Sequence, residues 1–161
     1  MTIKTGDRIP SATLFTFGAD GGPEPVSTDD FFAGRKVVVF GLPGAFTRTC
    51  SAKHLPGFVA HADAIKAKGV DEVACVSVND AMVMNAWSEA HGAAGKVIML
   101  GDGNCELTGA MGLDSDMSGR GYGTRSRRYA MIVEDGAVTH FALETKPGLN
   151  VSSAEDVLKA L

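Results

Sequence analysis

Hydrophobic residues in this chain gather in short runs that alternate with segments of helical periodicity. Three apolar runs predict buried strands, and they are residues 36–42, 72–78 and 96–100. Continuous runs of this length are typical of strands that are covered on both faces of a sheet. Residues 11–17 alternate between apolar and polar positions, which predicts a half-buried strand, and the Gly- and Pro-rich residues 18–25 predict a turn.

Helical segments follow two of these strands, and a third closes the chain. Their ranges are 51–69, 81–92 and 152–161. The first is expected to begin near residues 47–49 and to kink at Pro56, which cannot continue the hydrogen-bond ladder. Asp80 or Asn79 is the expected cap of the second helix, and Ser152 or Ser153 that of the third.

The order of these elements predicts an α/β architecture. Strand–helix–strand units give parallel neighbours with right-handed crossovers, whereas residues 128–143 read as an antiparallel hairpin with an Asp135–Gly136 turn. We therefore expect a single domain over residues 1–161, with a central mixed β-sheet flanked by helices. In such sheets, functional sites form at the carboxyl ends of the parallel strands.

Composition and charge narrow the class of protein. The chain of 161 residues is long enough to bury a core without disulfides. Its net charge of -4 argues against nucleic acid or an anionic membrane as the main partner. No apolar stretch reaches the roughly 20 residues of a membrane span, and the N-terminus lacks a signal peptide. We expect a cytoplasmic protein, or the mature form of an imported one.

The three cysteines do not suggest a disulfide framework or a metal centre. Their number is odd, no C-x-x-C occurs, and the histidines lack ligand spacing, so structural zinc is not expected. Cys50 stands apart, because it follows a strand and the turn "PGAF" and falls in the first turn of a helix. Free N–H groups and the helix dipole stabilise an anion there, and the thiolate is the nucleophilic form of cysteine. A small core residue would also fit this position, so the placement alone leaves both readings open.

Thr47 and Arg128 favour a reactive Cys50. Thr47, on the same turn, can place its hydroxyl near the sulfur. Arg128 begins a strand whose antiparallel pairing with residues 36–42 would put it beside Cys50, where a guanidinium stabilises a thiolate and holds an oxygen anion. Arg125 and Arg127 are expected to form a solvated basic turn.

Four segments in this order resemble the peroxiredoxins, specifically the type II, peroxiredoxin-5-like branch. They are "PGAFTRTCS", "HLPGF", "VACVSVND" and "RYAMIVEDG". The family pattern P-x-x-x-T-x-x-C is met by Pro43, Thr47 and Cys50. The resemblance implies a thioredoxin-like fold and a thiol peroxidase without metal or organic cofactor. It makes Cys50 the peroxidatic cysteine, Thr47 and Arg128 its catalytic partners, and Pro43 with the Gly44 N–H the lining of the substrate pocket.

The implied reaction is attack of the Cys50 thiolate on hydrogen peroxide or an alkyl hydroperoxide. Arg128 and Thr47 would donate hydrogen bonds to the leaving oxygen as its charge grows. The resulting Cys50 sulfenic acid must then be reduced by a second thiol.

The sequence leaves more than one candidate for that second thiol. Some type II members carry a resolving cysteine in a segment where this chain has Val151. Cys75 lies in mid-strand and is expected to be inert, whereas Cys105 follows a parallel strand and can face the same sheet edge as Cys50. Two strand spacings put those backbones roughly 10 Å apart, and a disulfide needs Cα atoms within about 7 Å. We expect a one-cysteine cycle recycled by glutathione and glutaredoxin, with thioredoxin as the alternative reductant.

Several further features remain expectations. Arg48 can favour the thiolate or bind carboxylates of the reductant, and His54 is expected to be structural or pocket-lining. Residues 114–126 are Gly- and Ser-rich and predict a mobile loop near the pocket. The resemblance implies a homodimer formed by loops near the active site, for which Phe46 and Phe17 are apolar candidates.

Three other functions compete with the peroxidase. A non-enzymatic peroxide sensor would be oxidised once without recycling. A thioredoxin-like disulfide reductase would need the missing C-x-x-C, and a binding module would carry an inert Cys50.

Overall fold

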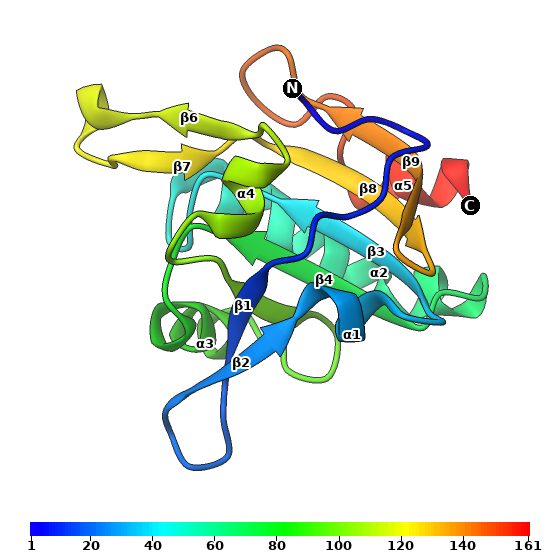
Figure 1. Ribbon diagram of the computed structural model, residues 1–161, viewed down its shortest axis with the longest axis horizontal. Helices are drawn as coiled ribbons and strands as arrows, with labels where there is room; N and C mark the ends of the chain where they lie inside the picture. The colour runs from blue at the N-terminus through cyan, green and yellow to red at the C-terminus, as the bar shows by residue number, and fades with distance from the viewer.

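The computed structural model describes residues 1–161 and has a seven-stranded mixed sheet at its centre (Figure 1). The strand order is β2-β1-β5-β4-β3-β8-β9. The strands are β1 (Thr13–Phe17), β2 (Pro23–Ser27), β3 (Lys36–Gly41), β4 (Glu72–Ser77), β5 (Ile98–Gly101), β8 (Tyr129–Glu134) and β9 (Ala137–Leu143). The three middle strands β5, β4 and β3 are parallel, and the outer ones pair antiparallel. The predicted central mixed sheet is confirmed.

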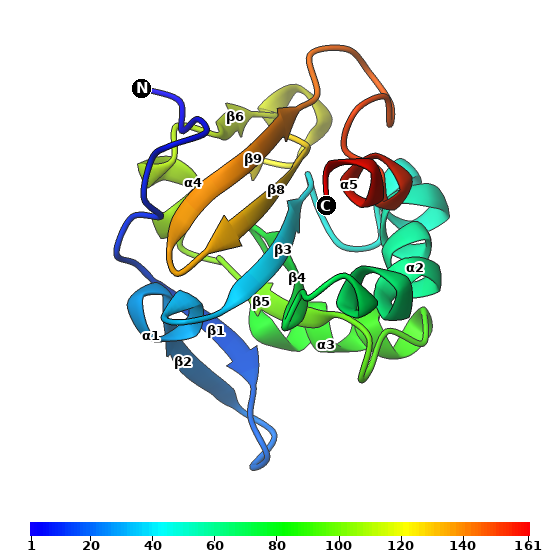
Figure 2. The same ribbon diagram turned by 90° about the vertical axis from the view of Figure 1, so that its right-hand side faces the viewer.

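Helices cover both faces of this sheet (Figure 2). One face carries α2 (Leu55–Ala67), α3 (Ala81–Ala90) and α5 (Ala154–Ala160), and the other carries α1 (Thr28–Phe32) and α4 (Glu106–Ala110). Because side chains alternate along β3, Val38 and Phe40 enter the core under α2, whereas Val37 and Val39 enter the core under α1 and α4. None of the helices combines the length and the apolarity that crossing a bilayer requires.

The helix after β3 begins at Arg48 and contains a π-helical segment, Cys50–His54, before α2. The Leu55 N–H donates to the carbonyl of Cys50, five residues earlier, which is the hydrogen bond of a π-helix. Pro56, which has no N–H, lies in the first turn of α2. A π-helical turn therefore directly precedes Pro56, where a kink was predicted, and π-helical turns are frequent at functional sites.

Two helix caps and one hairpin turn were predicted correctly from local residue types. Asp80 caps α3 by accepting from the Val83 N–H, and Ser153 caps α5. Asp135 and Gly136 both have positive φ, as a two-residue hairpin turn between β8 and β9 requires.

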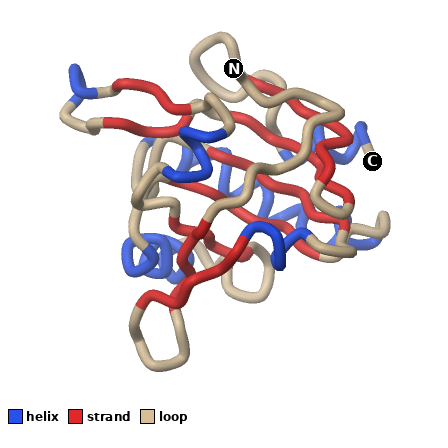
Figure 3. The backbone as a smooth tube through the Cα atoms, in the orientation of Figure 1, coloured by secondary structure: helices blue, strands red, loops and turns tan.

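Other elements were not predicted. They are β2, α1, α4, the strands β6 (Asp114–Asp116) and β7 (Thr124–Ser126), and the 3₁₀ turn Ser118–Arg120. Residues 114–126, expected to be a mobile loop near the pocket, form a two-stranded antiparallel hairpin that extends from the body of the molecule (Figure 3). Strands of three residues are too short to show an alternating pattern. The prolines of residues 18–25 suggested only a turn, but an edge strand such as β2 tolerates them.

Candidate active site

The thiol of Cys50 lies fully buried just beyond the carboxyl end of β3. The register of β3 and β8 pairs Gly41 with Tyr129, so Arg128 stands next to the end of β3, as the strand pairing predicted. The Arg128 Nη2 donates to the Cys50 Sγ at 3.3 Å. A cationic donor at this distance stabilises a thiolate relative to a thiol.

His54 orients the other arm of the guanidinium. Arg128 Nη1 donates to His54 Nδ1 at 2.8 Å, so Nδ1 is the acceptor and the Nε2–H donates to the Ser152 carbonyl at 2.9 Å. Burial and the Arg128 charge lower the pKa of His54 to about 3, so the ring is neutral near pH 7. A ring fixed at both nitrogens is a structural support, as expected, and is not a general base.

Glu144 holds the loop that contains Ser152, whose carbonyl accepts from His54. Its Oε2 accepts the backbone N–H groups of Asn150, Val151 and Ser152 and the hydroxyl of Ser152, all between 2.7 and 2.9 Å. Burial opposes ionisation, but these donors outweigh it, and the pKa of Glu144 lies below its usual range. The carboxylate thereby holds the Ser152 carbonyl against His54. No sequence pattern pointed to Glu144, because its partners come from a loop without a motif.

The loop before the helix is held in place by Arg125. Its Nη1 donates to the Pro43 carbonyl at 3.1 Å and its Nε donates to the Tyr122 carbonyl at 2.9 Å. A Cβ on Gly44 would clash with Arg125 Nη1, so any larger residue there would displace this side chain from the loop. The expected solvated turn is therefore wrong for Arg125, which is a half-buried brace of the loop.

Thr47 presents an acceptor to the site. Its hydroxyl donates to the Gly44 carbonyl at 2.7 Å, which leaves the oxygen lone pairs for a ligand. The expected hydrogen bond from Thr47 to a leaving oxygen does not fit this arrangement. The Gly44 N–H donates to no protein acceptor.

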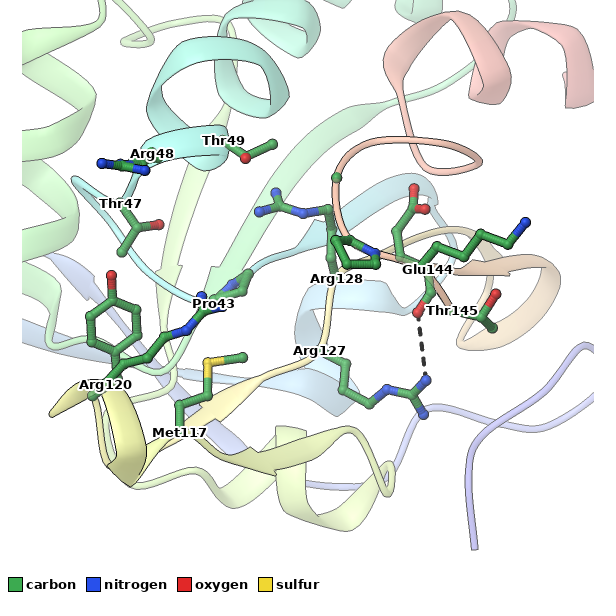
Figure 4. A pocket seen from close by; sticks show the side chains of 14 residues that line it. Pro43, Thr47, Arg48, Thr49, Met117, Arg120, Arg127, Arg128, Glu144 and Thr145 are labelled. Atoms are coloured by element: carbon green, nitrogen blue, oxygen red, sulfur yellow. Dashed lines mark hydrogen bonds between the residues drawn. The ribbon is translucent and has the colours of Figure 1, made fainter.

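A cavity of about 560 Å³ opens in front of Arg128 (Figure 4). It is lined by Pro43, Thr47, Arg48, Thr49, Met117, Arg120, Tyr122, Arg127, Arg128, Glu144, Thr145, Lys146, Pro147 and Gly148. Of the predicted site residues, Pro43, Thr47 and Arg128 line it, whereas Gly44 and Cys50 are buried behind the lining. Arg127, expected to be solvated, also lines it, and its guanidinium lies 3.5 Å from the Glu144 carbonyl oxygen.

Neither of the remaining cysteines lines the cavity. Cys75 is fully buried in β4, and burial raises the pKa of its thiol well above the ordinary value. Cys105 has a left-handed backbone at the start of α4, and burial raises the pKa of its thiol too. Cys105 follows the carboxyl end of β5, at the sheet edge expected for it, but α4 packs on the face opposite α2, whereas Cys50 belongs to the core under α2 (Figure 2). No group of three or more His, Cys, Asp and Glu side chains converges as metal ligands would.

The neutral His54 predicts an acid-sensitive stability. Since its pKa is about 3 in the folded protein and 6.5 in the unfolded chain, the unfolded state binds more protons between these values. His54 therefore does not lower the free energy of unfolding well above pH 6.5, and it lowers this free energy progressively as the pH falls below that value. We expect the free energy of unfolding to drop by about 2 kcal/mol from pH 7 to pH 5. Urea unfolding at both pH values measures it, and a His54→Gln variant should lose most of the difference. An equal drop in the variant would contradict this assignment.

Comparisons with known proteins agree with this geometry. The sequence matches the Redoxin family over residues 4–158. It is 52% identical to the chloroplastic peroxiredoxin-2E-2 of Oryza sativa subsp. japonica over 164 residues, which cover 99% of this chain and 73% of that protein. Reduced Prx3 from Vibrio vulnificus, solved in complex with H₂O₂, is 47% identical with a TM-score of 0.94 over 99% of both chains.

The chain therefore belongs to the Redoxin family and is a type II, peroxiredoxin-5-like peroxiredoxin, a thiol peroxidase of thioredoxin-like fold. The predicted family, fold class and peroxidase activity are confirmed. A structure from Burkholderia cenocepacia named as a thioredoxin reductase is also similar, with 49% identity and a TM-score of 0.97 over 100% of this chain and 99% of that one. The present chain lacks the C-x-x-C of a disulfide reductase.

Proposed function

We propose that this peroxiredoxin reduces hydrogen peroxide and alkyl hydroperoxides through Cys50 alone and is recycled by glutathione with glutaredoxin. The observation that carries the proposal is the placement of the three cysteines. Cys50 alone contacts a guanidinium beside the cavity, whereas Cys75 is buried in β4 and Cys105 belongs to the other face of the sheet. Cys75 shares a core cluster with Cys50, but it is fully buried in mid-strand, and the raised pKa of its thiol disfavours the thiolate that a resolving cysteine needs.

In the proposed first step, the Cys50 thiolate attacks one oxygen of the peroxide. An S–O bond forms, the O–O bond breaks, and the leaving oxygen takes the electron pair and then a proton, giving water or an alcohol. Arg128 donates to the oxygen on which charge grows, and Thr47 accepts from the peroxide O–H and so fixes its direction. Pro43 lines the approach, and the free Gly44 N–H is a further donor behind it. Cys50 ends as sulfenic acid.

In the second step, a thiol attacks the Cys50 sulfur. An S–S bond forms, the S–O bond breaks, and the oxygen leaves as water, which gives a mixed disulfide. A second thiol then releases Cys50 and leaves as the oxidised reductant. Because Cys50 is fully buried, a small thiol such as glutathione reaches its sulfur with less opening of the helix than a protein thiol needs.

We also propose that the protein forms a homodimer, and two exposed apolar side chains support this proposal. Phe46 is 57% exposed on the loop before Cys50 and has a left-handed backbone with φ 63°, and Phe17 is 41% exposed at the end of β1. Large apolar side chains on a constrained loop fit contact with a second copy.

The reductant is tested by following peroxide-dependent turnover in two complete recycling systems. We expect sustained turnover with glutathione, glutaredoxin and glutathione reductase, and slower turnover with thioredoxin and thioredoxin reductase. The double variant Cys75→Ala, Cys105→Ser should keep the glutathione-dependent rate. Turnover with thioredoxin alone, or loss of turnover in the double variant, would contradict the one-cysteine cycle.

A further inference from the structure

The cavity in front of Arg128 is strongly cationic for a chain whose net charge is -4. Five of its lining residues carry a positive charge, and they are Arg48, Arg120, Arg127, Arg128 and Lys146. None of the five forms an ion pair, since every salt bridge of the structure involves other residues. Positive charges that gather without internal partners in a concave site attract an anion.

The one carboxylate in the lining does not neutralise them. Glu144 Oε2 is occupied by the N–H groups of residues 150–152 and by the Ser152 hydroxyl, and Oε1 is buried without a hydrogen-bond partner. Neither oxygen lies within ion-pair distance of a cavity cation. The cavity therefore presents a net positive charge to whatever enters it.

The charged groups of three of these cations make no hydrogen bond or ion pair within the protein. Arg128 holds Cys50 and His54, and Arg127 contacts a carbonyl oxygen. In contrast, the side chains of Arg48, Arg120 and Lys146 are exposed and donate to no protein acceptor. They come from the start of the helix, the tip of the β6–β7 hairpin and the loop after β9. Figure 4 shows Arg48 and Arg120 on the Thr47 side of the cavity, away from Glu144.

The volume of the cavity indicates more than a hydrogen peroxide site. At about 560 Å³ it lies within the range of roughly 300–1,000 Å³ that is usual for small-molecule pockets. Arginine guanidinium groups bind carboxylates through two parallel hydrogen bonds. Cys50 lies behind this lining, so a small molecule in the cavity reaches the sulfur after local opening of the helix, while a carboxylate of the same molecule can stay at the cationic rim.

We propose that Arg48, Arg120 and Lys146 form an anion subsite that binds a carboxylate of the small molecule reacting at Cys50. That molecule is either the thiol that reduces the sulfenic acid or a carboxylate-bearing hydroperoxide. The thiol source rests on the proposed function. The peroxide source requires only the peroxidase activity. In both cases the bonds broken and formed are those of the two steps given above, and the subsite only positions the reactant.

The first arm of the test compares two small thiols that differ in charge. Cys50 sulfenic acid is formed with one equivalent of hydrogen peroxide and mixed rapidly with 3-mercaptopropionate or 2-mercaptoethanol. The readout is the ratio of their rate constants after correction for the thiolate fraction. In a triple variant, Arg48→Gln with Arg120→Gln and Lys146→Gln, we expect this ratio to fall about tenfold at low ionic strength, and added salt should shrink the difference.

The matched control removes the same kind of charge from a distant place. Lys36 begins β3, at the opposite end of that strand from Cys50, and the only ion pair of its side chain is a partly exposed one with Glu134. The Lys36→Gln variant should keep the thiol ratio of the unaltered protein. The second arm measures oxidation of Cys50 by linoleic acid hydroperoxide and by its methyl ester, again as a ratio.

The outcomes separate the two sources. A fall in the thiol ratio in the triple variant supports the subsite and assigns it to the reductant. A fall confined to the hydroperoxide ratio supports the subsite and assigns it to the peroxide. If neither ratio falls, or if Lys36→Gln lowers them equally, the subsite is overturned. If no monothiol reduces the sulfenic acid of the unaltered protein, the proposed one-cysteine cycle fails, and the hydroperoxide arm decides the subsite.

Discussion

Replacing Cys50 by serine is expected to lower the rate of peroxide consumption by about 10⁴-fold or more, the scale of losing a catalytic nucleophile. A serine hydroxyl is not ionised near neutral pH, and Arg128 at 3.3 Å can then stabilise no thiolate. The rate constant for hydrogen peroxide, measured by rapid mixing, tests this expectation. Because serine differs from cysteine by one atom, the fold should persist, and circular dichroism checks it.

Serine at position 105 provides the matched comparison. Cys105 is partly exposed at the start of α4, on the other face of the sheet, and contacts nothing in the cavity. The Cys105→Ser variant should react with peroxide at the rate of the unaltered protein. A large loss in Cys105→Ser together with retained activity in Cys50→Ser would reverse the assignment of the nucleophile.

Substitution of Arg128 by lysine has the second largest expected effect, a loss of about 10² to 10³-fold in the same rate constant, as for other transition-state donors. Lysine keeps the charge but has no planar fork, so it cannot contact Cys50 Sγ and His54 Nδ1 together. Stopped-flow oxidation of the reduced variant by hydrogen peroxide measures this rate constant.

Arg35 offers a control for the loss of a guanidinium as such. It is also half-buried and donates to the Phe31 carbonyl through two nitrogens, but it precedes β3 and lies at the far end of the sheet from Cys50. The Arg35→Lys variant should keep the peroxide rate even if it is less stable. A change of less than about threefold in Arg128→Lys, far below the loss typical of such donors, would remove Arg128 from the proposed chemistry.

The part of the site that the sequence predicted depends on strong local patterns. The uninterrupted apolar runs of β3 and β8 and the Asp135–Gly136 turn specified which strands pair and how. Their register then put Arg128 beside Cys50 without knowledge of any side-chain contact. Asp80 and Ser153 were found as caps because a cap is recognised by its own residue type.

The parts that were missed depend on contacts between segments without a pattern. Glu144 is linked to His54 only through Ser152, whose carbonyl accepts from the histidine ring. A backbone carbonyl occurs in every residue, so the residue types could not reveal this link. The β6–β7 hairpin brings Arg120 to the cavity, but its three-residue strands give no periodic signal. The face on which Cys105 lies was also beyond reach, because β5 is apolar on both sides and the α4 segment has only five residues.

The most direct test of the one-cysteine peroxidase is the intact mass of the reduced protein after one equivalent of hydrogen peroxide, with a sulfenic-acid trap present. We expect a single trap adduct that maps to Cys50, with Cys75 and Cys105 still free thiols. A loss of two hydrogens with a Cys50–Cys105 disulfide would contradict the one-cysteine cycle. An unchanged mass after seconds of exposure would contradict the assignment of Cys50 as the peroxidatic thiol.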